Sequence, residues 1–209
     1  MTDKGSLIVV SGPSGSGKGT ILNEFNQKYK DDKAIFSISA TTRAPRQGEK
    51  DGVNYYFISK DDFKSKVEND GFLEYAIYCD NYYGTPKNVV MDALQNGIDV
   101  ILEIETVGAM KVKKSYPEAV FVFILPPSME ELETRLTNRG TEPLDVIKTR
   151  LAEAKRELSL CTQYDYVIIN DDYKDAAARL NTVILSQRLK TKNNKKIIQE
   201  VLKNDLSSN

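Results

Sequence analysis

The sequence has 209 residues, of which 40% are hydrophobic, so it is long and apolar enough to bury a substantial core. Its formal net charge of −1 provides no general positive field, which argues against nucleic acid as a partner. It contains no histidine, which excludes imidazole general bases, histidine metal ligands and catalytic pairs of histidine with serine or cysteine.

The first predicted elements are a short strand at residues 7–10 and a helix that runs up to Tyr29. The strand is an apolar, β-rich run that is too short for a signal peptide or a membrane span. The helix is indicated by Ile21, Leu22 and Phe25, which recur at helical spacing. Strand, glycine-rich turn and helix in this order form the setting in which phosphate-binding loops occur.

The connecting loop, residues 11–20, reads SGPSGSGKGT and places Gly12, Gly17 and Lys18 at P-loop spacing. Glycines let the backbone N–H groups point inward, the helix N-terminus adds a positive end, and Lys18 brings a charge to the β- and γ-phosphates. We therefore expect a nucleoside triphosphate to contact the whole loop, which comprises Gly12, Pro13, Ser14, Gly15, Ser16, Gly17, Lys18, Gly19 and Thr20. Gly19 stands where P-loops usually carry the Ser or Thr that ligates magnesium, and Thr20 follows it.

Further buried strands are predicted later in the chain, because several apolar runs lack internal proline and glycine. They lie at residues 35–38, 100–102, 119–125 and 166–169, with helical patterns between most of them. Parallel strands need long, usually helical crossovers, so this alternation predicts an α/β domain with a largely parallel, doubly wound sheet.

Two regions interrupt the alternation. Residues 40–85 combine tyrosines, charges and glycines with short alternating runs around a helix opened by Ser59, which predicts a small inserted β-rich subdomain. Residues 127–162 indicate two helices, the first capped by Ser128 and the second separated from it by Gly140 and Pro143, which we interpret as a mobile helical lid. The remaining parts are the core, at 1–39, 86–126 and 163–190, and a lysine-rich tail with a short amphipathic helix, at 191–209.

Residues 36–57, FSISATTRAPRQGEKDGVNYYF, closely resemble the signature of guanylate kinases. The resemblance continues through FLEY, NYYGT, NRGTE and NDD, at residues 72–75, 81–85, 138–142 and 170–172, and covers most of the chain from Gly5 to about Leu189. It implies a P-loop kinase core with a parallel sheet flanked by helices, an inserted GMP-binding subdomain and a helical lid. It also implies ATP-dependent phosphorylation of GMP, and of dGMP, in purine nucleotide metabolism. The GKGT sequence is similar to that of nucleoside monophosphate kinases, which hold Mg²⁺ mainly through the donor phosphates and water.

The candidate acceptor site fits guanine chemically. Guanine presents N1–H and N2–H₂ donors beside its O6 and N7 acceptors, so a carboxylate facing the donors and hydroxyls facing O6 would recognise it, and Glu74, Ser39 and Thr85 supply these groups. Guanidinium forks and phenols suit the GMP phosphate. The resemblance implies a phosphate clamp and further GMP contacts, formed by Arg43, Arg46, Tyr55, Tyr83 and Glu49.

Two glutamates follow the strand at residues 100–102, where the family more often has aspartates. The resemblance implies that Glu103 faces magnesium-bound water and that Glu105 faces GMP. Thr106 and Val107 also depart from the commoner pattern.

Arginines in the predicted lid complete the candidate catalytic set. Arg135 and Arg139 are four residues apart and share a helix face, and Arg150 lies on the next helix. Cations brought in by a closing lid would stabilise the charge that develops during in-line transfer and exclude water. The resemblance implies this catalytic role for the three arginines together with Lys18, and it places Asn170, with Arg135, at the ATP site. No general base is required, because the attacking phosphate oxygen is already anionic.

Two other functions are compatible with parts of this sequence. Guanylate-kinase-like domains of scaffolding proteins bind peptides without phosphate chemistry, but the intact Lys18 loop and the set of arginines favour an enzyme. A kinase for another monophosphate, such as AMP or dTMP, is disfavoured by Ser39, Glu74 and Thr85. Individually, each tyrosine could also be a packed half-buried ring, and each arginine a surface residue.

Cys79 and Cys161 lie far apart without CxxC spacing, which suggests neither a disulfide framework nor a zinc site. A reducing cytoplasm is the expected location, with ATP and GMP as small-molecule partners and no membrane association. The sequence leaves open whether the chain forms a homo-oligomer.

Overall fold

The computed structural model describes residues 4–78, 80–138 and 144–206. Five parallel strands form the core sheet, in the order β2, β7, β1, β8, β9. These strands are β1 (Leu7–Ser11), β2 (Ala34–Phe36), β7 (Asp99–Glu103), β8 (Val120–Leu125) and β9 (Tyr166–Ile169). The predicted α/β fold with a parallel sheet is confirmed. The second strand ends at Phe36, earlier than the predicted Ile38, because the chain there leaves the core sheet for the inserted subdomain.

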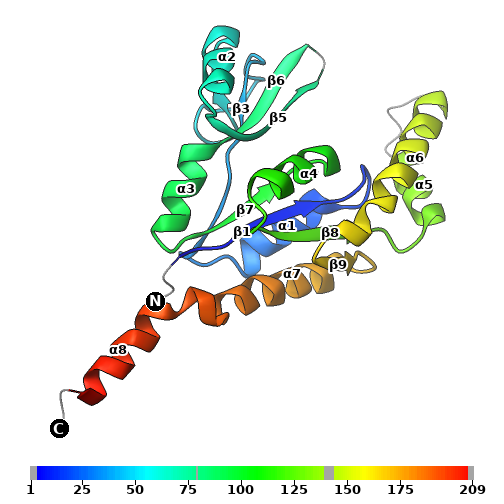
Figure 1. Ribbon diagram of the computed structural model, residues 1–209. Helices are drawn as coiled ribbons and strands as arrows, with labels where there is room; N and C mark the ends of the chain where they lie inside the picture. Colours follow the sequence, from blue (N-terminus) through cyan, green and yellow to red (C-terminus); the bar gives the residue numbers. More distant parts are fainter. Residues whose placement is uncertain (1–3, 79, 139–143, 207–209) are drawn as a thin grey trace.

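Helices cover both faces of this sheet (Figure 1). One face carries α1 (Lys18–Lys28) and α7 (Tyr173–Arg188), and the other carries α3 (Lys87–Gln95) and α4 (Thr106–Ser115). Successive side chains of β1 alternate between two hydrophobic clusters, with Ile8 and Val10 on the α1 and α7 side and Leu7 and Val9 on the other. Burial on both faces explains why the strand sequences are continuous apolar runs.

The inserted segment forms a second sheet in the order β4, β3, β6, β5. Its elements are β3 (Ala40–Thr41), β4 (Tyr56–Phe57), α2 (Lys60–Glu68), β5 (Phe72–Tyr78) and β6 (Asn81–Pro86). A separate small hydrophobic cluster contains Ala40, Phe63 and Phe72. The Ser59 side chain accepts a hydrogen bond from the Asp62 backbone N–H at 3.0 Å, so the predicted N-cap of this helix is confirmed.

The predicted lid region contains α5 (Met129–Thr137) and α6 (Leu144–Ser159), which lie together at one end of the molecule (Figure 1). Ser128 caps α5 by accepting a hydrogen bond from the Glu131 backbone N–H at 3.1 Å. The two helices share a hydrophobic cluster built on Leu132, Leu136, Ile147 and Ala154. The predicted break at Gly140 and Pro143 lies outside the described residues. A short 3₁₀ turn, Cys161–Gln163, leads from α6 to β9.

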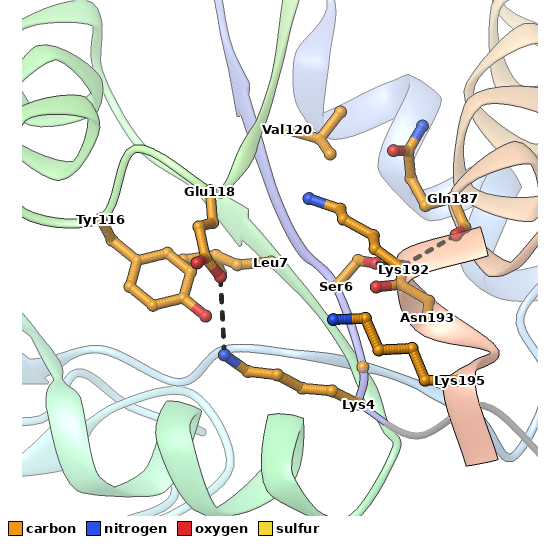
Figure 2. A pocket seen from close by; sticks show the side chains of 11 residues that line it. Lys4, Ser6, Leu7, Tyr116, Glu118, Val120, Gln187, Lys192, Asn193 and Lys195 are labelled. Carbon is orange, nitrogen blue, oxygen red and sulfur yellow. Dashed lines mark hydrogen bonds and ion pairs between the residues drawn. The ribbon is translucent and has the colours of Figure 1, made fainter. Parts of the chain in front are cut away.

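The C-terminal tail begins with a 3₁₀ turn, Thr191–Asn193, and ends in α8 (Lys195–Leu206), which extends away from the core (Figure 1). A cavity of about 220 Å³ lies where this tail meets the N-terminal end of β1 (Figure 2). Lys4 pairs with Glu118 across it at 3.7 Å, and the Asn193 amide donates to the Gln187 backbone carbonyl at 2.9 Å. Polar contacts within this cavity therefore join the start of the tail to the core.

No helix in the described part of the chain is long and apolar enough to cross a membrane.

Candidate functional site

The loop after β1 has a conformation suited to phosphates. Gly12, Gly15 and Gly17 have φ values of 152°, 88° and 87°, in the region where residues with a Cβ are strained. Gly17 is the N-cap of α1 and provides no side-chain hydrogen bond to the first turn. The first N–H groups of α1 can therefore bind an anion, and the helix dipole favours negative charge there.

Two of these glycines also permit close packing around the loop. A Cβ on Gly15 would lie 2.9 Å from Leu132 of α5, and one on Gly17 would lie 2.2 Å from the side-chain nitrogen of Asn170. Gly19 is different, because a Cβ there would meet nothing within 4 Å in the protein. Helix α5 and the residue after β9 thus approach the loop at positions where only glycine fits.

Lys18 is at the first position of α1, and its ammonium group donates to the backbone carbonyls of Gly12 and Pro13. The Ser16 hydroxyl is buried without a hydrogen-bond partner in the described structure. A buried hydroxyl without a partner is costly, and a phosphate oxygen would satisfy it. The loop residues therefore fit a phosphate group.

A cavity of about 320 Å³ opens on the outer side of the loop. The Asn170 side chain, 4% exposed, donates to the Ser16 carbonyl at 2.7 Å. Arg135 donates to the Asn170 carbonyl at 3.1 Å and pairs with Glu131 at 2.9 Å. The cavity is lined by Gly15, Gly17, Thr20, Arg135, Asn170, Asp171, Asp172 and Tyr173. The structure thus places Asn170 and Arg135 together beside the loop.

A second cavity, of about 290 Å³, lies between the inserted subdomain and the C-terminal end of β7. It is lined by Ser39, Tyr55, Glu74, Ala76, Tyr83, Gly84, Glu103, Ile104, Glu105, Val107 and Gly108. Glu103 is paired in register with Val10, directly before the phosphate-binding loop. In folds of this kind, ligands bind beyond the carboxyl ends of the parallel strands. Both cavities lie at that end of the sheet, one beside the residues that follow β1 and β9 and the other beside those that follow β7.

Glu74 is the buried carboxylate of this second cavity. It is 8% exposed, and its Oε1 accepts a hydrogen bond from the Thr85 hydroxyl at 2.8 Å. Burial raises the pKa of the Glu74 carboxyl, whereas the Thr85 hydrogen bond and the charge of Lys111 oppose the rise. A Cβ on Gly108 would lie 3.1 Å from Glu74 Oε2, so glycine there makes room for the carboxylate. The site can therefore present a desolvated acceptor to a ligand with N–H donors.

Arg43 lies beside the two predicted phosphate-binding tyrosines, with its guanidinium 5.4 Å from the centre of the Tyr55 ring. The Tyr55 and Tyr83 rings contact each other with centroids 6.0 Å apart. Glu49 binds the Arg43 guanidinium with both oxygens, at 2.9 and 3.0 Å, and accepts from the Arg46 backbone N–H at 2.7 Å. Glu49 therefore ties Arg43 to the backbone at Arg46, and none of these three residues lines the second cavity.

Glu103 and Glu105 end β7 and begin the approach to α4. The Glu103 side chain remains accessible to solvent, yet the surrounding protein raises its carboxyl pKa by desolvation, and the charge of Lys18 opposes that rise. The described residues contain no cluster of three or more metal-ligating side chains. This donor set fits Mg²⁺ held largely by phosphates and water, with one carboxylate nearby, and not a metal enclosed by protein ligands.

The structure describes two of the three arginines that the sequence places in the predicted lid. Arg150 is half-buried on α6, Arg135 contacts the loop region, and Arg139 lies outside the described residues. The sequence assigns no role to Gly108, which lines the second cavity, to Lys111, whose charge acts on Glu74, or to Thr106 and Glu157, which are hydrogen-bonded to each other. A helix starting directly after Glu105 puts Gly108 and Lys111 on the face next to it, and this spacing was the available signal.

Comparisons with known proteins agree with this geometry. The family model for guanylate kinase matches residues 4–187. Guanylate kinase from Caldanaerobacter subterraneus subsp. tengcongensis is 50% identical over 198 residues, which cover 95% of each chain. The relative of the same name from Carboxydothermus hydrogenoformans is 52% identical over 189 residues, covering 90% of this chain and 92% of the relative. The crystal structure of guanylate kinase from Anaplasma phagocytophilum is 33% identical, with a TM-score of 0.69 and 92% of both chains covered.

Proposed function

The chain belongs to the guanylate kinase family, and we propose that it catalyses the magnesium-assisted transfer of a phosphoryl group from ATP to GMP. The observation that carries the specificity is the Glu74 carboxylate, which is buried, accepts a hydrogen bond from Thr85 and lines the cavity between the inserted subdomain and the C-terminal end of β7. An isolated buried carboxylate is costly unless hydrogen-bonded, and the N1–H and N2–H₂ groups of guanine would provide the missing donors.

The inserted subdomain, residues 40–85, is proposed to bind GMP together with Ser39 and Glu105 of the core. Glu74 accepts from the guanine N–H groups, and the Ser39 hydroxyl faces O6. The Thr85 hydroxyl donates to Glu74 in the structure, so it would have to turn to O6 when guanine binds. Arg43, Arg46, Tyr55 and Tyr83 bind the GMP phosphate, with Glu49 holding Arg43 in position. GMP then lies with its phosphate directed toward the loop after β1.

The donor ATP is proposed to bind the loop from Gly12 to Thr20, with its base in the cavity beside Asn170 and Arg135. A phosphate oxygen of GMP attacks the γ-phosphorus, a new P–O bond forms, and the bond to the β,γ-bridging oxygen breaks with ADP as leaving group. Lys18, Arg135, Arg139 and Arg150 neutralise the charge on the moving group, with residues 127–162 as the lid. Because positioning and charge suffice, a chain without histidine can perform this reaction.

Mg²⁺, when bound, would supply positive charge that offsets the charge of the phosphates. Glu103, at the end of β7 and within the electrostatic field of Lys18, is the residue that would orient its water ligands. We place the reaction in the cytoplasm, where ATP and GMP are available and thiols such as Cys161 stay reduced.

The test is a coupled assay with ATP and Mg²⁺ against GMP, dGMP, IMP, AMP and dTMP. A site that hydrogen-bonds a substrate group can reject analogues lacking it by about 10⁴- to 10⁵-fold in kcat/KM, so GMP should be strongly preferred over AMP. Lys18→Ala is the control for the donor site, and it should remove transfer while leaving the fold intact. Equal activity on GMP and AMP would refute guanine recognition, and a fully active Lys18→Ala protein would refute the donor site.

A further inference from the structure

A hydrogen bond between Thr106 and Glu157 links the lid helix α6 to the core. Thr106 is the first residue of α4, directly follows Glu105 and is fully buried. Its hydroxyl donates to Glu157 Oε1 at 3.0 Å. Glu157 lies in the last turn of α6, so the bond connects the region proposed to bind GMP with the base of the lid.

Glu157 lies between charges from three elements. Lys18 of α1 attracts its carboxylate, whereas Glu105 before α4 and Glu153 on the same helix repel it. The side chain is half-buried, and a half-buried carboxylate requires hydrogen-bond donors to offset its lost hydration. The Thr106 hydroxyl is such a donor, and it lies on an element that does not belong to the lid.

The same face of α6 carries Arg150. Arg150 precedes Glu157 by seven residues, which is about two helical turns, so the two side chains point in nearly the same direction. A contact that fixes the direction of Glu157 therefore also fixes the direction of Arg150, about 10 Å further along the helix axis. A small rotation of α6 would therefore turn the Arg150 guanidinium together with Glu157.

We propose that Glu157 is a positioning residue for phosphoryl transfer, because its hydrogen bond with Thr106 sets the rotation of α6 and directs Arg150 toward the phosphate-binding loop. This inference rests on the proposed function, since it takes the role of Arg150 from it. Thr106 does not contact the substrate. It acts through Glu157, and Glu157 acts through Arg150.

Thr106→Val removes the hydroxyl and keeps the shape of the side chain, and Thr106→Ser is the matched control that keeps the hydroxyl. The valine variant should lower kcat about tenfold, because small misplacements of a catalytic group cost factors of ten to a hundred, while the KM values for ATP and GMP change less than about twofold. The serine variant should have nearly wild-type kcat. Glu157→Gln keeps the accepting oxygen and should stay closer to wild type than Glu157→Ala.

A double-mutant cycle separates positioning from general destabilisation. If Thr106 acts through Arg150, adding Thr106→Val to Arg150→Ala should lower kcat no further than Arg150→Ala alone. Multiplicative losses, or wild-type kcat in Thr106→Val, would overturn the proposal.

Hydrogen exchange of nucleotide-free protein provides a readout that needs no activity. The amides of α6 should exchange faster in Thr106→Val than in wild type or Thr106→Ser. Equal exchange rates in all three proteins would show that the Thr106 hydrogen bond does not hold α6 and would overturn the proposal. A wild-type protein inactive on GMP would instead refute the proposed function, so the two failures are distinguishable.

Discussion

At the scale of single residues, Glu74 has a protonation equilibrium that should be coupled to GMP binding. Without ligand, burial raises its carboxyl pKa above that of the unfolded chain, so the folded protein takes up a proton more readily. The contribution of Glu74 to the free energy of unfolding is therefore fully present below the pKa of the unfolded chain, and it is lost as pH rises through the raised pKa. Guanine N–H donors would stabilise the carboxylate and lower this pKa again.

GMP binding should therefore release protons near the raised pKa of Glu74, and the affinity for GMP should weaken as pH falls through it. Calorimetry in two buffers of different ionisation enthalpy measures the number of protons released. Glu74→Gln cannot ionise, so it should bind GMP more weakly and lack this part of the proton release.

The GMP phosphate also titrates, and the Glu74→Gln protein is the control that subtracts its contribution. IMP lacks the 2-amino group and should lose less affinity than GMP on the substitution. Identical proton release by wild type and variant would show that Glu74 does not titrate with the ligand.

At the scale of elements, the sequence predicts those features of the fold that depend on residues close together in the chain. Apolar runs identify the buried strands, and the spacing of Gly12, Gly17 and Lys18 identifies the loop between strand and helix. Ser59 and Ser128 were predicted as N-caps because capping involves residues only three positions apart. Strand ends are less certain, since β2 stops where the chain departs for another sheet.

Contacts between distant residues were not predictable in the same way. Glu49 is predicted to contact GMP, and its carboxylate also pairs with Arg43, a contact that no periodicity reveals. The bonds from Thr106 to Glu157 and from Arg188 to Asp99 join residues 51 and 89 positions apart. Such pairs depend on how complete elements pack, so one sequence indicates the residue types and not the partners.

Arg188, at the end of α7, provides a test of such a pair. Its Nε donates to Asp99 Oδ2 at 2.7 Å, its other nitrogens bind Asp31, and the Asp99 side chain is only 4% exposed. Arg188→Met would leave a buried carboxylate without its cation and should lower the free energy of unfolding by about 3 kcal/mol in urea denaturation.

Arg179→Met is the matched control, because its partner Asp171 is largely exposed, and this change should leave stability nearly unchanged. Adding Asp99→Asn to Arg188→Met removes the unpaired charge and should recover part of the loss. Equal stability of the two methionine variants would contradict a structural role for the Arg188 pair.

At the scale of the whole molecule, α8 differs from every element of the core. Its apolar side chains remain exposed: Ile197 by 45%, Ile198 by 41%, Val201 by 63% and Leu202 by 61%. A helix of 12 residues is marginal in water by itself, and little burial of α8 adds to its stability. The turn that precedes α8 is instead held to the core, because the side-chain amides of Asn193 and Asn194 donate to backbone carbonyls at the end of α7.

Two truncations should therefore behave differently although they differ by only five residues. A chain that stops after Asn194 loses α8 and should unfold in urea within about 1 kcal/mol of the full chain, with unchanged kcat on GMP. A chain that stops after Leu189 also loses the Asn193 amide on the Gln187 carbonyl, at 2.9 Å, and the Asn194 amide on the Arg188 carbonyl, at 2.7 Å. These amides satisfy carbonyls at the end of α7, so the shorter chain should lose about 1 to 3 kcal/mol more. If removal of α8 alone caused the larger loss, α8 would have to pack against the protein in solution, in contrast to its exposed position.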